Sequence, residues 1–255
     1  MATVYNILDM KVNPVQYADI LNQMDFWIRH QEMGRYIIVA NAHSVMEFRT
    51  NPFFKNAVDQ SDLVIPDGMP LVVVGRWRGF HLKQRADGPG LMEEAMRISG
   101  EKGWRHFFYG GTPETLKIFL QRLRKQWPKV QVAGSLAPPF RPLTDEEDKN
   151  TAEQINNSNT DILWVGLGCP KQEIWISDHH NQLKVPVILG VGQAFDLLAG
   201  VKQRAPAWMS NLGFEWLYRL VKEPRRLWKR YLINNPRFIY MVLREEIGLR
   251  LKKSK

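Results

Sequence analysis

The stretch DILWVGLGCPKQE at residues 161–173 predicts a buried β-strand that passes through a glycine turn into a helix. Residues 162–165 supply the apolar strand, and Gly166 and Gly168 open the turn. Pro170 suits the first turn of a helix, because proline lacks the N–H group that has no partner there anyway. A strand that feeds a helix in this way is typical of a parallel α/β sheet.

A second stretch of this kind, VILGVGQAFDLLAG at residues 187–200, carries Gly192 and Gln193 in its turn. A helix that begins after such a turn offers unpaired backbone N–H groups and the positive end of its dipole to an anion. In the first stretch these positions hold Lys171, Gln172 and Glu173. Two such turns close together predict a nucleotide-type site at the carboxyl edge of a parallel sheet. Each turn by itself also fits a purely structural role.

Strand and helix signals alternate through the first two hundred residues. The expected strands are short apolar runs at residues 4–8, 36–40, 63–65, 104–109, 130–133, 162–165 and 185–189. Helix starts are marked by Asn13-Pro14, by Thr112-Pro113 and by a capping box of Thr144 with Glu147. The alternation predicts an α/β, Rossmann-like fold in which helices cover both faces of a mostly parallel sheet. Residues 133–143, with three prolines, are expected to form a loop.

The strand signals end near residue 207. Helices are expected at residues 208–222, 225–233 and 237–252, with breaks at Pro224 and Pro236. We therefore expect two parts, an α/β domain at residues 1–207 and a helical appendage at residues 208–255.

The net charge of +9 is placed unevenly. Residues 1–201 carry 21 Lys and Arg against 22 Asp and Glu, whereas residues 202–255 carry 14 against 4. Such asymmetry predicts that the C-terminal end has an anionic partner. That partner could be a membrane surface, a nucleic acid or a phosphorylated substrate. Aromatic residues lie among these basic residues, as they do in helices at a membrane interface: Trp228, Tyr231, Phe238 and Tyr240. The alternative is a helical hairpin that packs on the core and presents a solvated basic face.

Several classes of protein are disfavoured. The single cysteine, Cys169, rules out an internal disulfide and a cysteine-rich zinc site. No window is apolar for long enough to predict a membrane span, and the first ten residues have no signal-peptide pattern. P-loop, HExxH, GxSxG and Asp-x-Asp motifs are missing. We expect no metal and no cofactor, so cationic side chains or helix ends must neutralise any bound nucleotide phosphates.

Polar side chains follow two of the expected strands, at the edge where such a site would lie. Asp67 comes just after residues 63–65 and could act as a general base, although an Asp-Gly pair also forms simple turns. Asn41 and His43 follow the strand at residues 36–40. For His43 a helix-capping role is favoured over that of a base.

In the appendage, basic residues recur at intervals of three and four: Arg219, Lys222, Arg226 and Arg230. They share one helix face if the helix passes Pro224 without rotating. They could neutralise phosphates, or they could simply be solvated charges.

At these residues the chain resembles the WecG/TagA/CpsF family, which is glycosyltransferase family 26. The matching segments are collinear and cover nearly the whole chain: VANAHSV (39–45), SDLVIPDGMPLV (61–72), QRADGPGLM (84–92), FFYGGTPE (107–114), DILWVGLGCPKQE (161–173), GVGQAFDLLAG (190–200), RAPAW (204–208) and GFEWLYRLVKEPRR (213–226).

The resemblance implies inverting, metal-independent transfer of a sugar from a UDP-sugar to a polyprenyl-diphosphate-linked acceptor in cell-wall or surface polysaccharide synthesis. It implies a cytoplasmic protein that is peripheral on the inner face of the cell membrane, with an anionic membrane surface rather than a nucleic acid as its partner. It leaves open whether the chain forms a homo-oligomer. The alternative is a catalytically silent nucleotide-binding protein whose basic tail binds a membrane or RNA.

The resemblance also implies site residues. Asp67 is the expected base, with Asn41 in the same pocket and Arg85 as the third catalytic residue. The expected substrate-binding residues are Gly110, Gly111, Gly166, Gly168, Lys171, Gln172, Glu173, Gly192, Gln193, Asp196, Arg219, Arg226 and Lys229.

The chain departs from the family pattern at three of its positions. Val39 stands where threonine is usual, Gly90 where aspartate is usual, and Gln193 where glycine is usual. These changes suggest an altered donor or acceptor, and loss of activity is the other interpretation.

Overall fold

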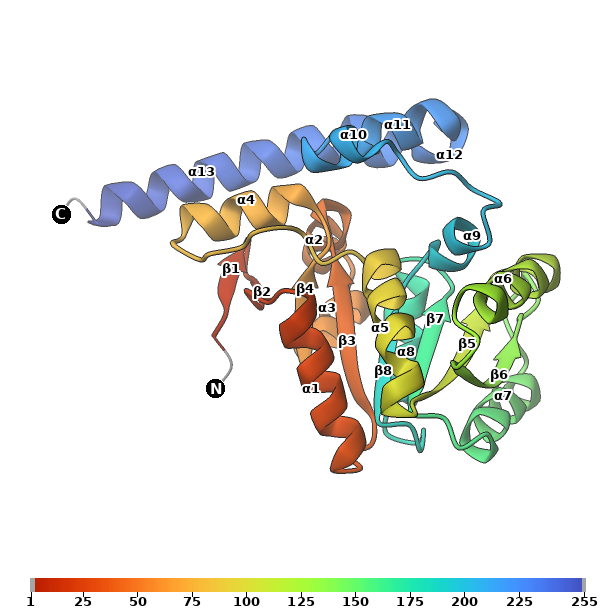
Figure 1. The fold of residues 1–255 in the computed structure, drawn as a ribbon. Coiled ribbons are helices and arrows are strands. Elements are labelled where there is room, and N and C mark those ends of the chain that lie inside the picture. Colours follow the sequence, from red (N-terminus) through yellow and green to blue (C-terminus); the bar gives the residue numbers. More distant parts are fainter. Residues whose placement is uncertain (1–2, 254–255) are drawn as a thin grey trace.

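The computed structural model of the chain describes residues 3–253, except for the side chains at positions 207, 211, 230, 250, 252 and 253. Six strands form one sheet, in the order β4 (Leu63–Pro66), β3 (Arg35–Ala40), β8 (Val187–Gly190), β7 (Ile162–Gly166), β5 (Arg105–Gly110) and β6 (Gln131–Leu136). Every neighbouring pair in this sheet is parallel. The predicted α/β fold is therefore confirmed (Figure 1).

Helices cover both faces of the sheet, which is why its strands are apolar on both sides. One core lies under α1 (Tyr17–Arg29), α5 (Gly88–Lys102), α6 (Pro113–Gln126) and α9 (Ala194–Leu198). The other lies under α2 (Ala42–Thr50), α3 (Pro52–Asp59), α7 (Asp145–Asn157) and α8 (Lys171–His179). Alternate residues of a strand serve the two cores, so that Ile37 packs into the first and Ile38 into the second. The predicted capping box of Thr144 and Glu147 starts α7.

The first expected strand is not part of this sheet. β1 (Tyr5–Ile7) forms an antiparallel hairpin with β2 (Met10–Val12), a strand that the sequence patterns missed. Leu8 and Asp9 form the two-residue connection, and both have positive φ angles, of 48° and 73°. That geometry matches the twist of a tight hairpin, so the chain turns back on itself before it reaches the main sheet.

One other local expectation is wrong. Residues 134–136, expected in a loop, extend β6 along β5, because the Phe107 ring can lie against a glycine at position 134.

His179, at the end of α8, is buried. Its ring stacks on Trp175, and its Nε2 atom lies 2.7 Å from Asp148 Oδ2 on α7.

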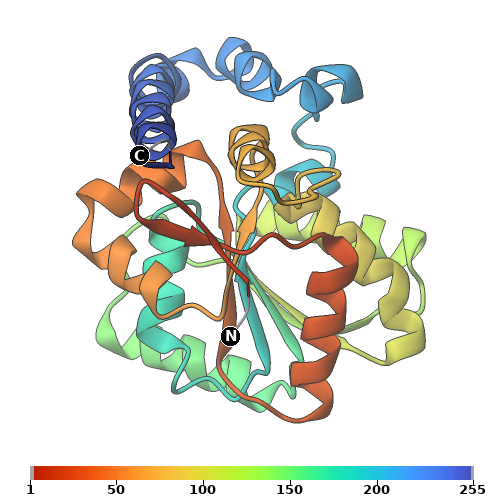
Figure 2. The same ribbon diagram turned by 90° about the vertical axis from the view of Figure 1, so that its left-hand side faces the viewer.

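The C-terminal helices lie across the carboxyl edge of the sheet (Figures 1 and 2). The helix expected at residues 208–222 is interrupted at Gly213 (φ +80°), which separates α10 (Ala207–Asn211) from α11 (Glu215–Lys222). The expected break at Pro224 is present, before α12 (Pro224–Trp228).

The expected break at Pro236 is wrong, because a π-helical segment, Lys229–Asn234, leads directly into α13 (Asn235–Lys253). The wider turn of a π-helix relieves the clash between a proline ring and the carbonyl four residues earlier. Within residues 3–253, no helix combines the length and the apolar run that crossing a bilayer requires.

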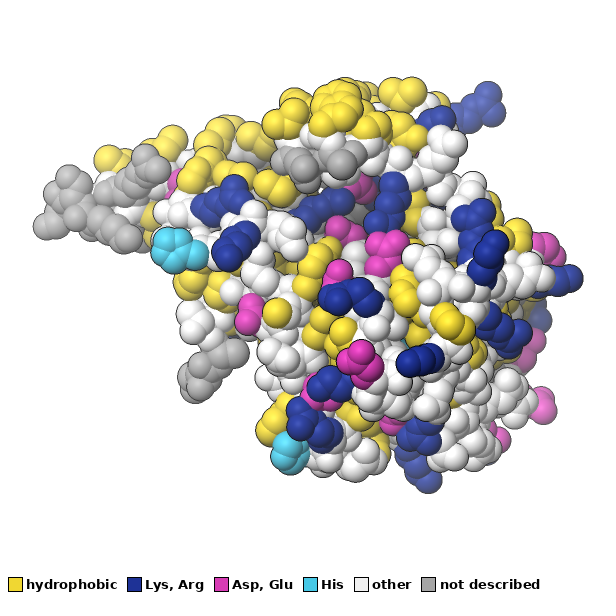
Figure 3. Space-filling view, in the orientation of Figure 1, with side chains coloured by type: hydrophobic (Ala, Val, Ile, Leu, Met, Phe, Trp, Pro, Cys, Tyr) yellow, Lys and Arg dark blue, Asp and Glu magenta, His cyan; other side chains and the backbone are white. Residues whose placement is uncertain are grey.

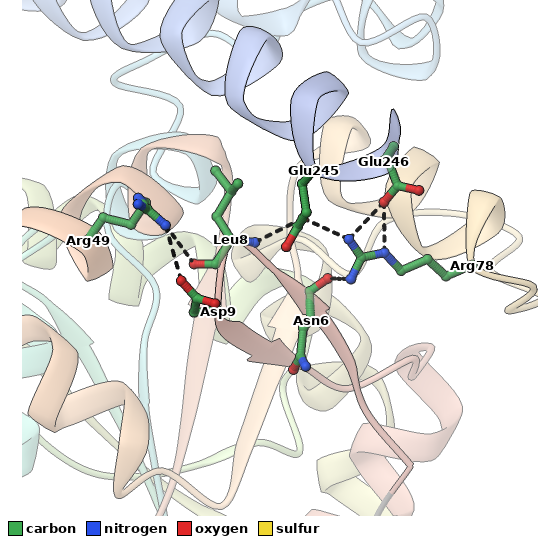
Figure 4. Close-up of polar contacts among 7 residues, drawn as sticks. All are labelled: Asn6, Leu8, Asp9, Arg49, Arg78, Glu245 and Glu246. Atoms are coloured by element: carbon green, nitrogen blue, oxygen red, sulfur yellow. Dashed lines mark hydrogen bonds and ion pairs between the residues drawn. The ribbon is translucent and has the colours of Figure 1, made fainter. Parts of the chain in front are cut away.

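An arginine fixes α13 to the body of the molecule. Arg78, at the end of α4 (Met69–Trp77), donates from Nε and Nη2 to Glu246 Oε1 at 2.9 and 2.7 Å, and from Nη2 to Glu245 Oε2 at 2.8 Å (Figure 4). It also donates to the carbonyl of Asn6, and Glu245 accepts a bond from the Leu8 N–H group. The same helix buries Phe238 and Val242 in the core. The long helix therefore has a fixed orientation relative to α4.

Candidate active site

A cleft of about 1090 Å³ opens where β3, β4, β7 and β8 end. Residues that follow these four strands form its floor, and residues of α11 and α12 form its roof. Dark blue and magenta side chains face each other across the hollow below the C-terminal helices (Figure 3). The cleft is thus lined by charges of both signs.

Asp67 lies on this floor, directly after β4. Its N–H group donates to the carbonyl of Ala40 at 2.8 Å, which ties the end of β4 to that of β3. Burial raises the pKa of the Asp67 carboxyl to about 6; Arg85 and an Asn41 hydrogen bond act to lower it, and Asp87 and Glu215 act to raise it further. A carboxylate of this pKa can accept a proton near neutral pH.

Asn41 holds that carboxylate in place. It is the N-cap of α2, and its Oδ1 atom accepts bonds from the N–H groups of His43 and Ser44 at 3.0 and 3.4 Å. With its oxygen used in this way, its Nδ2 atom donates to Asp67 Oδ2 at 3.3 Å. Asn41, rather than His43, is therefore the capping residue, and the His43 Nδ1 atom lies 3.9 Å from Glu47 Oε1.

Arg85 is paired with acidic groups from two directions. Its Nη1 atom lies 2.6 Å from Glu215 Oε2 on α11, and its Nε atom lies 3.5 Å from Asp87 Oδ2. The Tyr17 hydroxyl donates to the same Asp87 oxygen at 3.1 Å and accepts a bond from the Asp87 N–H group at 3.2 Å. Tyr17, Asp87 and Glu215 all line the cleft, and sequence reasoning missed them.

One side chain joins the two glycine turns. Gln172 Oε1 accepts bonds from the N–H groups of Gly168 at 3.1 Å and Gly192 at 3.0 Å, and its Nε2 atom donates to Glu173 Oε1 at 2.8 Å. Gln172 is buried at the start of α8. The N–H groups of both glycines thus bond to a side chain of the protein.

The roof contributes cations to the cleft. Arg219 Nη2 donates to Gln193 Oε1 at 2.8 Å, which joins α11 to the second glycine turn. Lys202 Nζ lies 3.3 Å from Asp196 Oδ2 and 3.4 Å from Glu223 Oε1. Glu223 also pairs with Arg226, at 2.6 Å.

The structure brings most of the expected site residues together. Those that line the cleft are Asn41, Asp67, Arg85, Gly168, Gln172, Glu173, Gly192, Gln193, Arg219 and Arg226. Six expected residues lie outside its lining: Gly110, Gly111, Gly166, Lys171, Asp196 and Lys229. Gly110 ends β5 and Gly111 follows it, and β5 is separated from β8 by β7 and is therefore farther from Asp67. Lys222 also lines the cleft, whereas the Arg230 side chain is outside the described residues.

Among the described residues, no group of three or more His, Cys, Asp or Glu side chains is placed to hold a metal ion.

This α/β fold, with a charged cleft at the carboxyl edge of its sheet, has the architecture of an α/β enzyme that binds its ligand at that edge. The family can also be assigned. A profile of the glycosyl transferase WecG/TagA/CpsF family matches residues 5–252, so the chain belongs to that family and is a glycosyltransferase.

Named relatives cover almost the full chain. An N-acetylglucosaminyldiphosphoundecaprenol N-acetyl-beta-D-mannosaminyltransferase of Bacillus spizizenii is 27% identical over 245 residues, which are 93% of this chain and 93% of the relative. The protein of the same name in Bacillus subtilis is 28% identical over 244 residues, 96% of this chain and 91% of the relative. That of Staphylococcus aureus is 28% identical over 243 residues, 95% and 92% of the two chains.

Proposed function

We propose that this glycosyltransferase moves a sugar from a UDP-sugar to a hydroxyl group of a second sugar, which is linked through diphosphate to a polyprenyl lipid. The names of the relatives support an acceptor and a product of this kind in cell-wall polysaccharide synthesis. The observation that carries the proposal is Asp67, a carboxylate with a raised pKa that Asn41 holds at the floor of a cation-rich cleft.

The mechanism that fits this geometry is a single displacement. Asp67 removes the proton of the acceptor hydroxyl while that oxygen attacks the anomeric carbon from the face opposite to UDP. The bond from the anomeric carbon to the phosphate oxygen breaks, and the configuration of the sugar inverts. Negative charge develops on the leaving diphosphate, where Arg219 and Arg226 from the roof would stabilise it. In this proposal these cations neutralise the leaving diphosphate, as a divalent metal ion does in other transferases.

The test is transfer itself. Full-length protein is incubated with a panel of UDP-sugars, UDP-N-acetylmannosamine included, and a short-chain N-acetylglucosaminyl-diphosphate lipid, with and without EDTA. We expect a disaccharide lipid that forms equally well with the chelator. Absence of product with every donor would contradict the transfer, and loss of product in EDTA would contradict the metal-free mechanism.

We also propose that residues 208–255 form an appendage that rests on the inner face of the cell membrane, with residues 1–207 as the catalytic domain. Hydrophobic side chains form a band along the C-terminal helices (Figure 3). The large apolar side chains exposed in residues 208–251 include Trp208, Val221, Trp228, Leu232, Ile239, Tyr240, Ile247 and Leu251. So much exposed apolar surface marks an interaction site. Tyr231 and Phe238, expected among the interfacial aromatics, instead pack inward. Flotation on anionic liposomes tests this surface. The double variant Val221→Ser/Ile247→Ser should lose the flotation of the wild-type protein, and unchanged flotation would contradict the proposal.

A further inference from the structure

The reaction proposed above brings two diphosphates into one cleft, and their charges repel. Two separate sets of cations are therefore needed, one for each diphosphate. The roof cation Arg219 lies over the turn after β8, because it donates to Gln193 there. A second set, Arg76 and Lys83, lines the cleft from α4 and the segment that follows it, on the β4 side.

The segment at residues 80–86, here called the strap, is firmly braced beside Asp67. The Ala86 N–H group donates to the carbonyl of Pro66 at 2.9 Å. Gln16 bonds to the backbone of Gln84 in both directions, at 2.9 and 3.1 Å. The strap is therefore held to the end of β4 at one end and to the start of α1 in its middle.

Arg76 braces the strap from the other side. Its Nε and Nη2 atoms donate to the carbonyls of Leu82 and Lys83, at 2.7 and 2.8 Å, and the Leu82 side chain is buried. The backbone of Lys83 is thus fixed while its side chain is exposed to the cleft. The Arg76 guanidinium is thus fixed against the backbone of Lys83, and both residues line the cleft.

Neither of these two cations is in an ion pair with a described residue. Arg85 pairs with Glu215 and Arg204 with Glu93, whereas no described carboxylate lies within 4.0 Å of Arg76 or Lys83. An anion at this position would therefore meet positive charge that no protein carboxylate already neutralises.

The spacing from Asp67 suits the acceptor. Lys83 is three residues from Ala86, at most about 10 Å of extended chain. Arg76 is seven residues along α4 from Met69, about 10 Å at the rise of a helix, and Met69 is two residues after Asp67. The diphosphate of a lipid-linked sugar lies one sugar ring away from the hydroxyl that Asp67 would deprotonate. Two residues after Arg76, Arg78 bonds to α13, whose exposed apolar side chains Ile247 and Leu251 are part of the proposed membrane surface.

From this placement, we infer that Arg76 and Lys83 form an anion subsite for the diphosphate of the acceptor, separate from the subsite for the donor. The inference rests on the proposed function and assigns its acceptor side.

Lys83→Ala is the sharpest test, because the strap is braced through the backbone carbonyl of Lys83 and the variant leaves that contact intact. Kinetics are measured without membranes, with a water-soluble N-acetylglucosaminyl-diphosphate lipid as acceptor. The KM for this acceptor should rise about tenfold, while kcat and the KM for the UDP-sugar stay within about twofold. Lys83→Arg should restore most of the loss. Lys117→Ala, on the exposed side of α6, is the matched control and should leave all three constants unchanged.

Two results would overturn the subsite. One is an unchanged acceptor KM in Lys83→Ala. The other is an equal rise in KM with octyl N-acetylglucosaminide, which has no phosphate. A phospholipid headgroup as the true ligand would appear as weaker liposome binding with unchanged kinetics on the soluble acceptor, which also contradicts the inference. Failure of the wild-type protein to transfer any sugar would instead contradict the proposed function.

Discussion

The Tyr17 hydroxyl occupies the space that a β-carbon on Gly90 would need. The same hydroxyl is fixed by two hydrogen bonds to Asp87, whose other carboxylate oxygen caps α5 by accepting a bond from the Gly90 N–H group at 2.8 Å. The departure from the family pattern at Gly90 is therefore matched by a tyrosine from α1. Tyr17 and Asp87 line the cleft next to Arg85.

Gly90→Ala should therefore push the Tyr17 ring out of its place. We expect a loss of about 1 to 3 kcal/mol in the free energy of unfolding, typical of overpacking. In the Tyr17→Ala background, Gly90→Ala should lower the free energy of unfolding much less, because the Tyr17 ring no longer fills the space that the new β-carbon needs. Urea unfolding of the two single variants and the double variant measures this coupling. Additive effects would mean that the two residues are independent.

The raised pKa of Asp67 predicts that both activity and stability depend on pH. A base must be ionised, so kcat/KM should fall about tenfold per pH unit below the pKa of about 6. Asp67→Asn should lower turnover by about two to four orders of magnitude and leave UDP affinity nearly intact. A pH-rate profile and UDP titration measure these effects, and wild-type turnover in the variant would refute the role of the base.

The same substitution should stabilise the fold at neutral pH. The pKa of Asp67 is higher in the folded chain than its ordinary value of 3.8, so ionisation costs folding free energy above pH 6. That cost disappears as the pH falls from 6 towards 4, where the folded protein binds the proton first. At pH 7.5 Asp67→Asn should gain on the order of 2 kcal/mol, at about 1.4 kcal/mol per pKa unit. Melting curves at pH 7.5 and pH 4 test this, and a gain that persists at pH 4 would contradict it.

Sequence patterns predict the sheet and one edge of the site because both depend on local signals. Asn41 and Asp67 each follow an apolar strand, and parallel strands end at the same edge, so their proximity was predictable. The partners of Arg85 were not. Glu215 is distant in sequence and reaches it only because α11 lies over the cleft, a tertiary contact that no periodicity encodes. The hairpin of β1 was missed for a related reason, since an apolar run does not reveal which strand it pairs with.

The sequence motif around Gln172 does not predict which groups its side chain contacts. Its position suggests a ligand contact, yet its amide joins the turns at Gly168 and Gly192. Gln172→Ala should therefore weaken UDP binding about tenfold or more, and should also cost about 1 to 2 kcal/mol of stability, because the half-buried N–H groups of both glycine turns lose their acceptor. Calorimetric titration with UDP and urea unfolding measure the two effects. Gln182→Ala, at an exposed position just after α8, is the control. A variant that binds UDP weakly at full stability would make Gln172 a direct ligand instead.

Arg78 sets the orientation of α13, because it pairs with both Glu245 and Glu246 while its own side chain is only 15% exposed. Arg78→Ala leaves two carboxylates of α13 without their cation at a largely buried contact. We expect the free energy of unfolding to fall by about 2 kcal/mol or more. We also expect faster tryptic cleavage of the basic C-terminal helices, because α13 is then held less firmly. Arg124→Ala is the control, because it removes an exposed arginine and, like Arg78→Ala, one tryptic site. Replacing Arg78, Glu245 and Glu246 together by uncharged residues should recover part of the loss, because no unpaired charge then remains. Equal cleavage rates in the Arg78 and Arg124 variants would mean that packing of Phe238 and Val242 alone holds the helix.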